Sequence, residues 1–294
     1  IGNVYGNAIY FENTGTSLEP TFATSSNNPF NIANVGIGAS PEFTDLDADG
    51  DLDAFIGDAH GDTIYFENTG TSLAPAFAAS SSNPFSLGDV GYVANPIFAD
   101  LDADGDLDAF IGNSGGNTIY FENTGTSLAP TFAESSSNPF NLDSVGMYAA
   151  PIFADFDGDG DLDAFISNYH GNTIYFENTG TSKSPAFAAS SSNPFSLVNI
   201  GPRGQCCPTL LRPDLADLDA DGDLDAFIGN YNGNTIYFEN TTSVVPGRTI
   251  DVATNGGSTA FSSSDVSLST SISAENDAPI ASGSAYLTSI TEDS

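Results

Sequence analysis

Apolar and polar residues alternate along four short runs that recur through most of the chain, and such alternation predicts β-strands. In the run LDAFIGN, for example, Leu52, Ala54 and Ile56 alternate with residues of the opposite face. The run NTIYFENT is rich in aromatic and β-branched residues, and NPIFADLD and APAFAAS provide two further runs. We expect units of four strands, called A to D in chain order from NPIFADLD, with a short strand D at the edge.

These units repeat with a nearly constant period. The phrase YFENT begins at Tyr10, Tyr65, Tyr120, Tyr175 and Tyr237, so the successive offsets are 55, 55, 55 and 62 residues. Four-stranded units of about this length are typical of β-propeller blades, which bury both faces of each sheet by stacking. The sequence therefore predicts an all-β propeller of about five four-stranded blades over residues 1–247, with an incomplete first blade followed by blades around 40–95, 95–150, 150–205 and 205–247.

The loop that joins strand A to strand B is dominated by aspartate. It reads DLDADGDLDAF from Asp45, Asp100 and Asp217, and DFDGDGDLDAF from Asp155. Carboxylates packed this densely repel one another unless they remain solvated or surround a cation. Asp at positions 1, 3, 5, 7 and 9 with Gly at position 6 is typical of an oxygen cage for a hard cation, in which position 7 offers its backbone carbonyl. The regular spacing and the strand flanks favour this interpretation over a disordered acidic tract.

The sequence thus predicts about four Ca²⁺ sites. Position 12 is Ile in every loop, where a helix-flanked calcium loop has a bidentate Glu, so we expect weak sites of roughly 10⁻⁴ to 10⁻³ M. Sites this weak fill only where calcium is abundant, as outside the cell. The predicted ligands are Asp45, Asp47, Asp49, Asp51 and Asp53; Asp100, Asp102, Asp104, Asp106 and Asp108; Asp155, Asp157, Asp159, Asp161 and Asp163; and Asp217, Asp219, Asp221, Asp223 and Asp225.

The repeat DLDADGDLDAFIGN…GNTIYFENTGTS resembles the FG-GAP-like, VCBS-type calcium-binding repeats of bacterial secreted and surface proteins, whose blades are similar to those of the integrin α-subunit propeller. The resemblance covers residues 1 to about 247 and implies a calcium-binding propeller. The closing stretch ENDAPIASGSAYLTSITEDS resembles the start of the cadherin-like modules of giant bacterial adhesins. The resemblance therefore implies that the chain comes from an adhesive protein.

Composition agrees with an extracellular setting. The chain has 39 acidic and 4 basic residues, a formal charge of −35, and 20 of the acidic residues are loop aspartates. Four Ca²⁺ ions would add +8 and leave about −27. Such a surface repels nucleic acid and anionic membranes, and no apolar run is long enough to insert in a membrane. Ile1 opens the chain partway through a blade without a signal peptide, so we expect a processed product or a segment of a longer, secreted protein.

Residues 248–294 lie outside the repeats and are predicted to hold a Ser- and Thr-rich β-segment, with strand-like runs RTIDVAT and DVSLSTSIS. The first unit of this sequence has strands B, C and D but neither strand A nor its aspartate loop. Our hypothesis is that residues 248–273 complete that blade by strand addition, either within the chain or between copies. Pairing within the chain would give a monomer, whereas exchange would give a head-to-tail filament.

One insertion interrupts the period. Between Pro194 and Asp217 lie seven residues more than in the matching spans, and the insert GPRGQCCPTLLRP holds both cysteines, Cys206 and Cys207. The two thiols could form a strained disulfide with each other, pair between chains or stay reduced. No His is placed by sequence to act as their base, so we favour a structural staple over a thiol enzyme.

The turns between strands B and C vary where the rest of the repeat barely does. Because strand direction alternates, these turns lie on the face opposite the aspartate loops. Their polar and aromatic side chains would suit a protein or sugar ligand, although ordinary exposed turns explain them equally well. The candidate ligand-binding residues of this face and of the insert are His60, Tyr169, His170, Arg203, Arg212 and Tyr231.

The expected function is a calcium-stabilised adhesion or structural module, not an enzyme. A lectin-like propeller is the alternative, and a hydrolase ranks third because every regularly spaced carboxylate is already assigned to metal. The expected partners are a protein or glycan at a cell surface, or copies of the chain itself.

Overall fold

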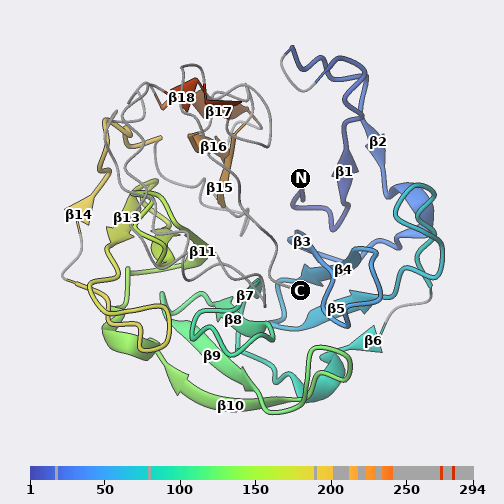
Figure 1. The fold of residues 1–294 in the computed structure, drawn as a ribbon. Helices are drawn as coiled ribbons and strands as arrows, with labels where there is room; N and C mark the ends of the chain where they lie inside the picture. The colour runs from blue at the N-terminus through green and yellow to red at the C-terminus, as the bar shows by residue number, and fades with distance from the viewer. Residues whose placement is uncertain are drawn as a thin grey trace, which may run out of the picture.

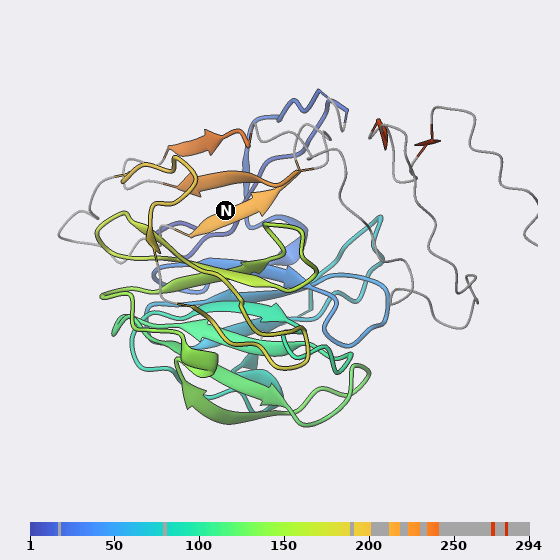
Figure 2. The ribbon, with the colours of Figure 1, turned by 60° about the vertical axis from the view of Figure 1, so that its left-hand side comes forward.

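The computed structural model describes residues 1–16, 19–78, 81–188, 191–200, 212–217, 223–229, 234–240, 272–273 and 280–281, and within these ranges the chain is all-β apart from short 3₁₀ turns. Its sheets are arranged around a common centre, as Figure 1 shows. Viewed after a turn of 60°, the strands of successive sheets lie in stacked layers (Figure 2). No helix among the described residues is long and apolar enough to cross a membrane.

Three sheets have four strands each, and in each of them neighbours in sequence pair in antiparallel fashion. The first contains β3 (Ser40–Thr44), β4 (Asp53–Gly57), β5 (Thr63–Phe66) and β6 (Ser81–Ser82). The second contains β7 (Asn95–Ala99), β8 (Asp108–Gly112), β9 (Thr118–Asn123) and β10 (Phe132–Ser137). The third contains β11 (Ala150–Ala154), β12 (Asp163–Ser167), β13 (Thr173–Phe176) and β14 (Ser191–Ser192).

A fourth sheet has three strands, β15 (Pro213–Ala216), β16 (Asp225–Gly229) and β17 (Thr235–Phe238). The innermost strands meet around the centre, since β3 contacts β7, β7 contacts β11, and β11 contacts β15. This is a β-propeller arrangement of four blades, which confirms the predicted all-β propeller.

Two small ladders lie outside these blades. Strands β1 (Ile9–Tyr10) and β2 (Ser26–Asn27) pair with each other, as do β18 (Ile272–Ser273) and β19 (Ile280–Ala281). The predicted count of about five four-stranded blades is therefore not confirmed. The hypothesis that residues 248–273 complete the first blade falls almost wholly outside the described residues; among those that are described, β18 pairs with β19.

Aromatic side chains on the second strand of each blade build the core between blades. Phe55 and Phe110 are completely buried. The Phe55 ring lies 4.5 Å from that of Phe98 in the next blade, and Phe110 lies 4.7 Å from Phe153 in the same way. The backbones approach closely as well, because a Cβ at Gly57 would lie 2.1 Å from the Ala94 carbonyl oxygen. Apolar clusters of this kind join one blade to the next.

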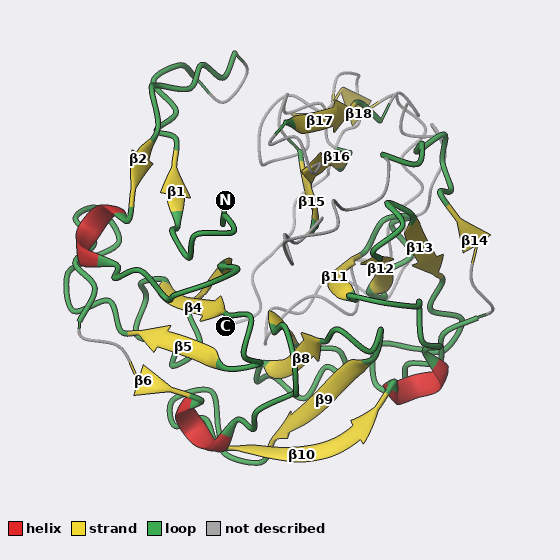
Figure 3. Ribbon diagram, turned by 180° about the vertical axis from the view of Figure 1, so that it is seen from behind, coloured by secondary structure: helices red, strands yellow, loops and turns green. Residues whose placement is uncertain are grey.

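The recurrent NPF segments form short 3₁₀ turns at the outer rim, η1 (Pro29–Asn31), η2 (Pro84–Ser86) and η3 (Pro139–Asn141) (Figure 3). Asn83, which precedes η2, adopts a left-handed conformation and its Oδ1 accepts the Thr63 amide at 2.9 Å. The turn directs Phe85 onto Tyr65, with ring centroids 5.1 Å apart. Phe85 therefore packs on the third strand of its blade.

Candidate metal-binding loops

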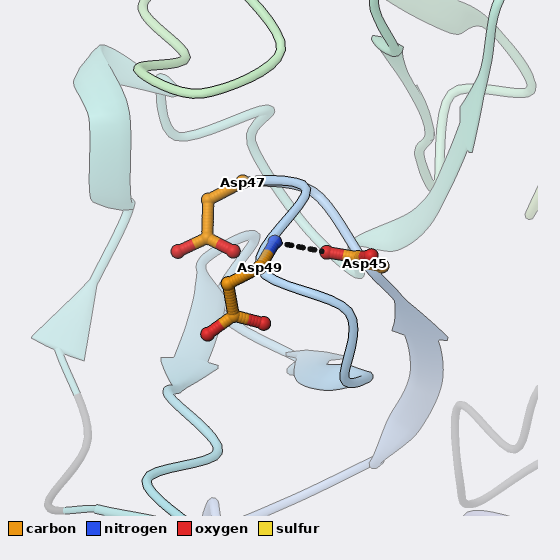
Figure 4. A group of neighbouring side chains, drawn as sticks. All are labelled: Asp45, Asp47 and Asp49. Atoms are coloured by element: carbon orange, nitrogen blue, oxygen red, sulfur yellow. Dashed lines mark hydrogen bonds between the residues drawn. The ribbon is translucent and has the colours of Figure 1, made fainter. Parts of the chain in front are cut away.

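Three aspartate loops each gather three carboxylates. In the loop between β3 and β4, one carboxylate oxygen from each of Asp45, Asp47 and Asp49 lies within 4.8 Å of the others (Figure 4). Equivalent groups follow β7 and β11, formed by Asp100, Asp102 and Asp104 and by Asp155, Asp157 and Asp159. The structure thus brings together the residues at positions 1, 3 and 5 of each of these loops, as the spacing predicted.

The loop backbone is folded tightly by its own side chains. The Asp49 and Gly50 amides donate to the two oxygens of Asp45, each at 3.1 Å, and the Asp51 amide donates to Asp49 Oδ1 at 3.1 Å. Gly50 at position 6 has φ 96°, a left-handed value that a residue with a Cβ rarely adopts, and Ala48 at position 4 is also left-handed at 56°. These turns curl the chain so that alternate carboxylates point inward.

Several carboxylate oxygens in these loops are buried without any hydrogen-bond donor. They are Asp47 Oδ1, Asp51 Oδ1, Asp106 Oδ1 and Asp155 Oδ1. A buried, unpaired carboxylate oxygen is costly, because it has lost water and gained nothing in return. A hard cation prefers oxygen ligands of this kind and would satisfy them. The residues present therefore fit a divalent cation, and the fit rests on these atoms rather than on charge alone.

The pKa values of two loop aspartates reflect the same crowding of carboxylates. Burial, reinforced by the neighbouring Asp49 carboxylate, raises the pKa of Asp51 above its usual range. In the second loop, burial and Asp104 raise the pKa of Asp106 in the same way. Without a counter-charge, these two aspartates therefore bind protons more readily than an isolated aspartate does.

The aspartate at position 9 has a different environment. Asp53 is buried at the start of β4, and its two oxygens accept the Tyr65 hydroxyl at 2.9 Å and the Asn68 amide at 2.7 Å. Burial raises its pKa to about 6, and that of Asp108 to about 7, while the hydrogen bonds act in the opposite sense. We did not anticipate the tyrosine partner from the sequence. Its only signal is the recurrence of Tyr 12 residues after position 9.

The remaining predicted residues are distributed unevenly. In the fourth loop, Asp217, Asp223 and Asp225 are described, whereas Asp219 and Asp221 lie outside the described residues. Arg203, Cys206, Cys207 and Tyr231 also lie outside them. Arg212 directly precedes β15, and its guanidinium pairs with Glu42 of β3.

His60, Tyr169 and His170 lie in turns between second and third strands, at the end of the blades opposite the aspartate loops. The rings of Tyr169 and His170 are 5.4 Å apart, and Tyr148 lies 5.7 Å from Tyr169. His60 belongs to a different blade from Tyr169 and His170.

A belt of half-exposed apolar side chains lies beside these turns. Ile37, Tyr92 and Met147 occupy the same repeat position and are 49%, 48% and 47% exposed. Their carbonyls accept amides from the turns at 2.7–2.8 Å, so the belt follows the turns from blade to blade. We call Ile37, Tyr92 and Met147 the turn-face belt.

Comparisons with known proteins agree with the repeat. A family model described as FG-GAP-like repeat matches residues 45–111 and 100–166, so the chain carries two FG-GAP-like repeats, which include all three aspartate groups. A solved structure of the Photorhabdus luminescens Tc holotoxin pore is 11% identical, with a TM-score of 0.34. The match covers 79% of this chain and 12% of that chain. No curated protein matches.

Proposed function

We propose that this chain is a calcium-stabilised propeller module of a larger extracellular protein, with an adhesive or structural role and no catalytic activity. The observation that carries the proposal is the set of buried, unpartnered carboxylate oxygens in loops that already gather three aspartates each. Buried carboxylate oxygens without a partner would destabilise these loops unless a cation bound to them. The two FG-GAP-like repeats, which span the aspartate loops of three blades, support the same interpretation.

The aspartates at positions 1, 3 and 5 would hold the ion, with further oxygens from positions 7 and 9. When bound, Ca²⁺ would neutralise part of the repulsion within each loop and fix the connection between the first two strands of a blade. About four ions are expected, one for each aspartate loop of the sequence. The remaining negative charge disfavours nucleic acid and anionic membranes as partners.

Thermal unfolding tests the proposal directly. The melting temperature of the intact chain should fall sharply in excess chelator and recover with Ca²⁺ in roughly the millimolar range. Mg²⁺ should restore it poorly, because it demands tighter octahedral geometry. A melting temperature that does not respond to chelator or to added calcium would rule the proposal out.

A lectin-like function is the second candidate, and the turn-face belt favours it. In a chain of net charge −35, the belt presents apolar and aromatic side chains without a charge of its own, which suits an uncharged ligand such as a neutral glycan. A glycan array probed with the parent and with Tyr92→Ala separates the two functions. Binding of a neutral glycan that the variant loses would support the lectin, and a parent that binds none would exclude it.

A further inference from the structure

We infer that the tyrosine of each YFENT segment that follows an aspartate loop is a positioning residue for its calcium site: its hydroxyl aims the position-9 carboxylate, and its ring links the site to the packing between blades. The inference rests on the proposed calcium function. It assigns a role to Tyr65, Tyr120, Tyr175 and Tyr237.

The contact is the same in four blades. The tyrosine hydroxyl donates to the position-9 carboxylate at 2.9 Å for Tyr65–Asp53, 2.8 Å for Tyr120–Asp108, 2.9 Å for Tyr175–Asp163 and 3.0 Å for Tyr237–Asp225. The other oxygen of each carboxylate accepts a backbone amide at 2.7–2.9 Å. Two donors on two different oxygens fix the rotation of the carboxylate.

A carboxylate that is held by these two hydrogen bonds can still bind a cation. An ionised carboxylate has about four acceptor positions, so each oxygen of Asp108 keeps one for a cation after accepting its hydrogen bond. Carboxylates that bind metal are commonly held by a second hydrogen-bonding partner, which orients them and makes their geometry reproducible. Tyr120 is the group in place for this task, since only 6% of it is exposed and its hydroxyl points at Asp108.

The ring end of the same side chain lies in the core between blades. The Tyr120 ring is 5.0 Å from Phe110 and 5.3 Å from Phe140. Phe110 in turn lies 4.7 Å from Phe153 of the next blade. A continuous chain of contacts therefore runs from the aspartate loop through Tyr120 to the neighbouring blade, and an ion that fixes Asp108 favours the packed arrangement of both blades.

A purely structural tyrosine would behave differently. If Tyr120 served only the core, removal of its hydroxyl would cost the same stability with and without calcium. If it positions a ligand, the cost must be larger when the ion is bound, because coupling between two sites is reciprocal. The difference between these two costs is the quantity to measure.

The test is the Tyr120→Phe variant of the full chain, unfolded with urea in excess Ca²⁺ and in excess chelator. The matched control is Tyr10→Phe, which occupies the same repeat position and packs on Phe30 at 5.3 Å, in the unit for which this sequence holds no aspartate loop. We expect Y120F to weaken one site about tenfold. Its loss of stability should then be larger in calcium than in chelator by about 1.4 kcal/mol. Y10F should lose the same amount in both.

Calorimetric titration of the parent and of the fourfold variant Y65F/Y120F/Y175F/Y237F gives the second readout, with calcium alone as the probe. Equal affinities, together with equal losses for Y120F in calcium and chelator, would overturn the inference. A parent that binds no calcium would instead defeat the proposed function, so the two failures are distinguishable. If Y120F does not fold in chelator, Y65F replaces it, because Tyr65 is only half-buried.

Discussion

The ion pair between Glu42 and Arg212 provides the sharpest test of how the blades are held together. Arg212 precedes β15 and reaches β3, where its guanidinium donates to the Pro41 carbonyl at 3.0 Å and pairs with the Glu42 carboxylate. In the described part of the chain this is the one pair of a Lys or Arg with a carboxylate. The two partners are 170 residues apart and join the last described blade to the first complete one.

The loss of stability expected when this ion pair is broken follows from the burial of its two side chains. The two side chains are 16% and 17% exposed, so the pair lies close to the buried limit. Breaking a buried pair by removing one partner costs about 3–5 kcal/mol, against about 0–1 kcal/mol at the surface. We therefore expect Arg212→Ala to lower the free energy of unfolding by about 2–3 kcal/mol. Ile97 and Ile152 occupy the position of Glu42 in the next two blades, so E42I/R212A should recover most of that loss.

The loss should also depend on pH. Burial raises the pKa of Glu42, and Arg212 partly offsets that rise. In R212A the offset disappears, so the folded-state pKa of Glu42 rises further. A carboxyl whose pKa is higher in the folded than in the unfolded state costs no stability where it is protonated in both states and destabilises the fold where it is ionised in both. The difference in stability between R212A and the parent should therefore be largest near neutral pH and shrink as the pH falls.

Urea unfolding of the parent, R212A and E42I/R212A between pH 4 and 8, at fixed calcium, measures these quantities, with Glu42→Gln as the uncharged control. An R212A variant as stable as the parent at pH 7 would refute the reasoning. So would a loss that stays constant with pH, since it would not involve the Glu42 carboxyl.

Three further substitutions test the loops and one turn. Asp49→Ala removes a side-chain ligand and should weaken calcium binding at that loop about tenfold. Calorimetric titration compares it with Asp51→Ala: a milder loss would support binding of position 7 through its carbonyl, as the spacing predicts, whereas an equal loss would assign the buried Asp51 Oδ1 as the ligand. Asp58 occupies the same position of the repeat as Asn168, whose Nδ2 donates to the Val145 carbonyl at 3.0 Å. Asp58→Asn should stabilise the chain by about 1 kcal/mol, because the side-chain amide of the new residue could donate to a neighbouring carbonyl in the same way. A D58N variant no more stable in urea than the parent would contradict this.

The strands and loops were predictable because the repeat states the same pattern several times. Alternation in LDAFIG placed a strand where β4 occurs, and the spacing of the loop brought Asp45, Asp47 and Asp49 together. The outer strand follows the same rule. The run APTFAES contributes to β10, which begins at Phe132, and Phe77 of the run APAFAAS makes the equivalent bridge to Asn68.

Contacts that depend on register or on distant segments could not be inferred. The Asp53–Tyr65 bond requires β4 and β5 to pair with Phe55 opposite Tyr65, and alternation alone fixes the face of a side chain but not its partner. The Glu42–Arg212 pair requires the curvature of the whole arrangement. The sequence marks Glu42 only as an acid where the next two blades have Ile, and Arg212 only as one of four basic residues in the chain.

The Glu42–Arg212 pair can specify the order of the blades, which nearly identical repeats leave poorly defined. When blades share almost the same sequence, any inner strand can pack beside any other, so the order of blades is poorly specified by apolar contacts. A buried pair adds little net stability, but only one arrangement satisfies Glu42 and Arg212 together. We therefore expect E42I/R212A to unfold at nearly the parent's urea midpoint and yet to populate additional, exchanged assemblies, visible by size-exclusion chromatography with light scattering. A single species matching the parent would show that the repeats order themselves without this pair.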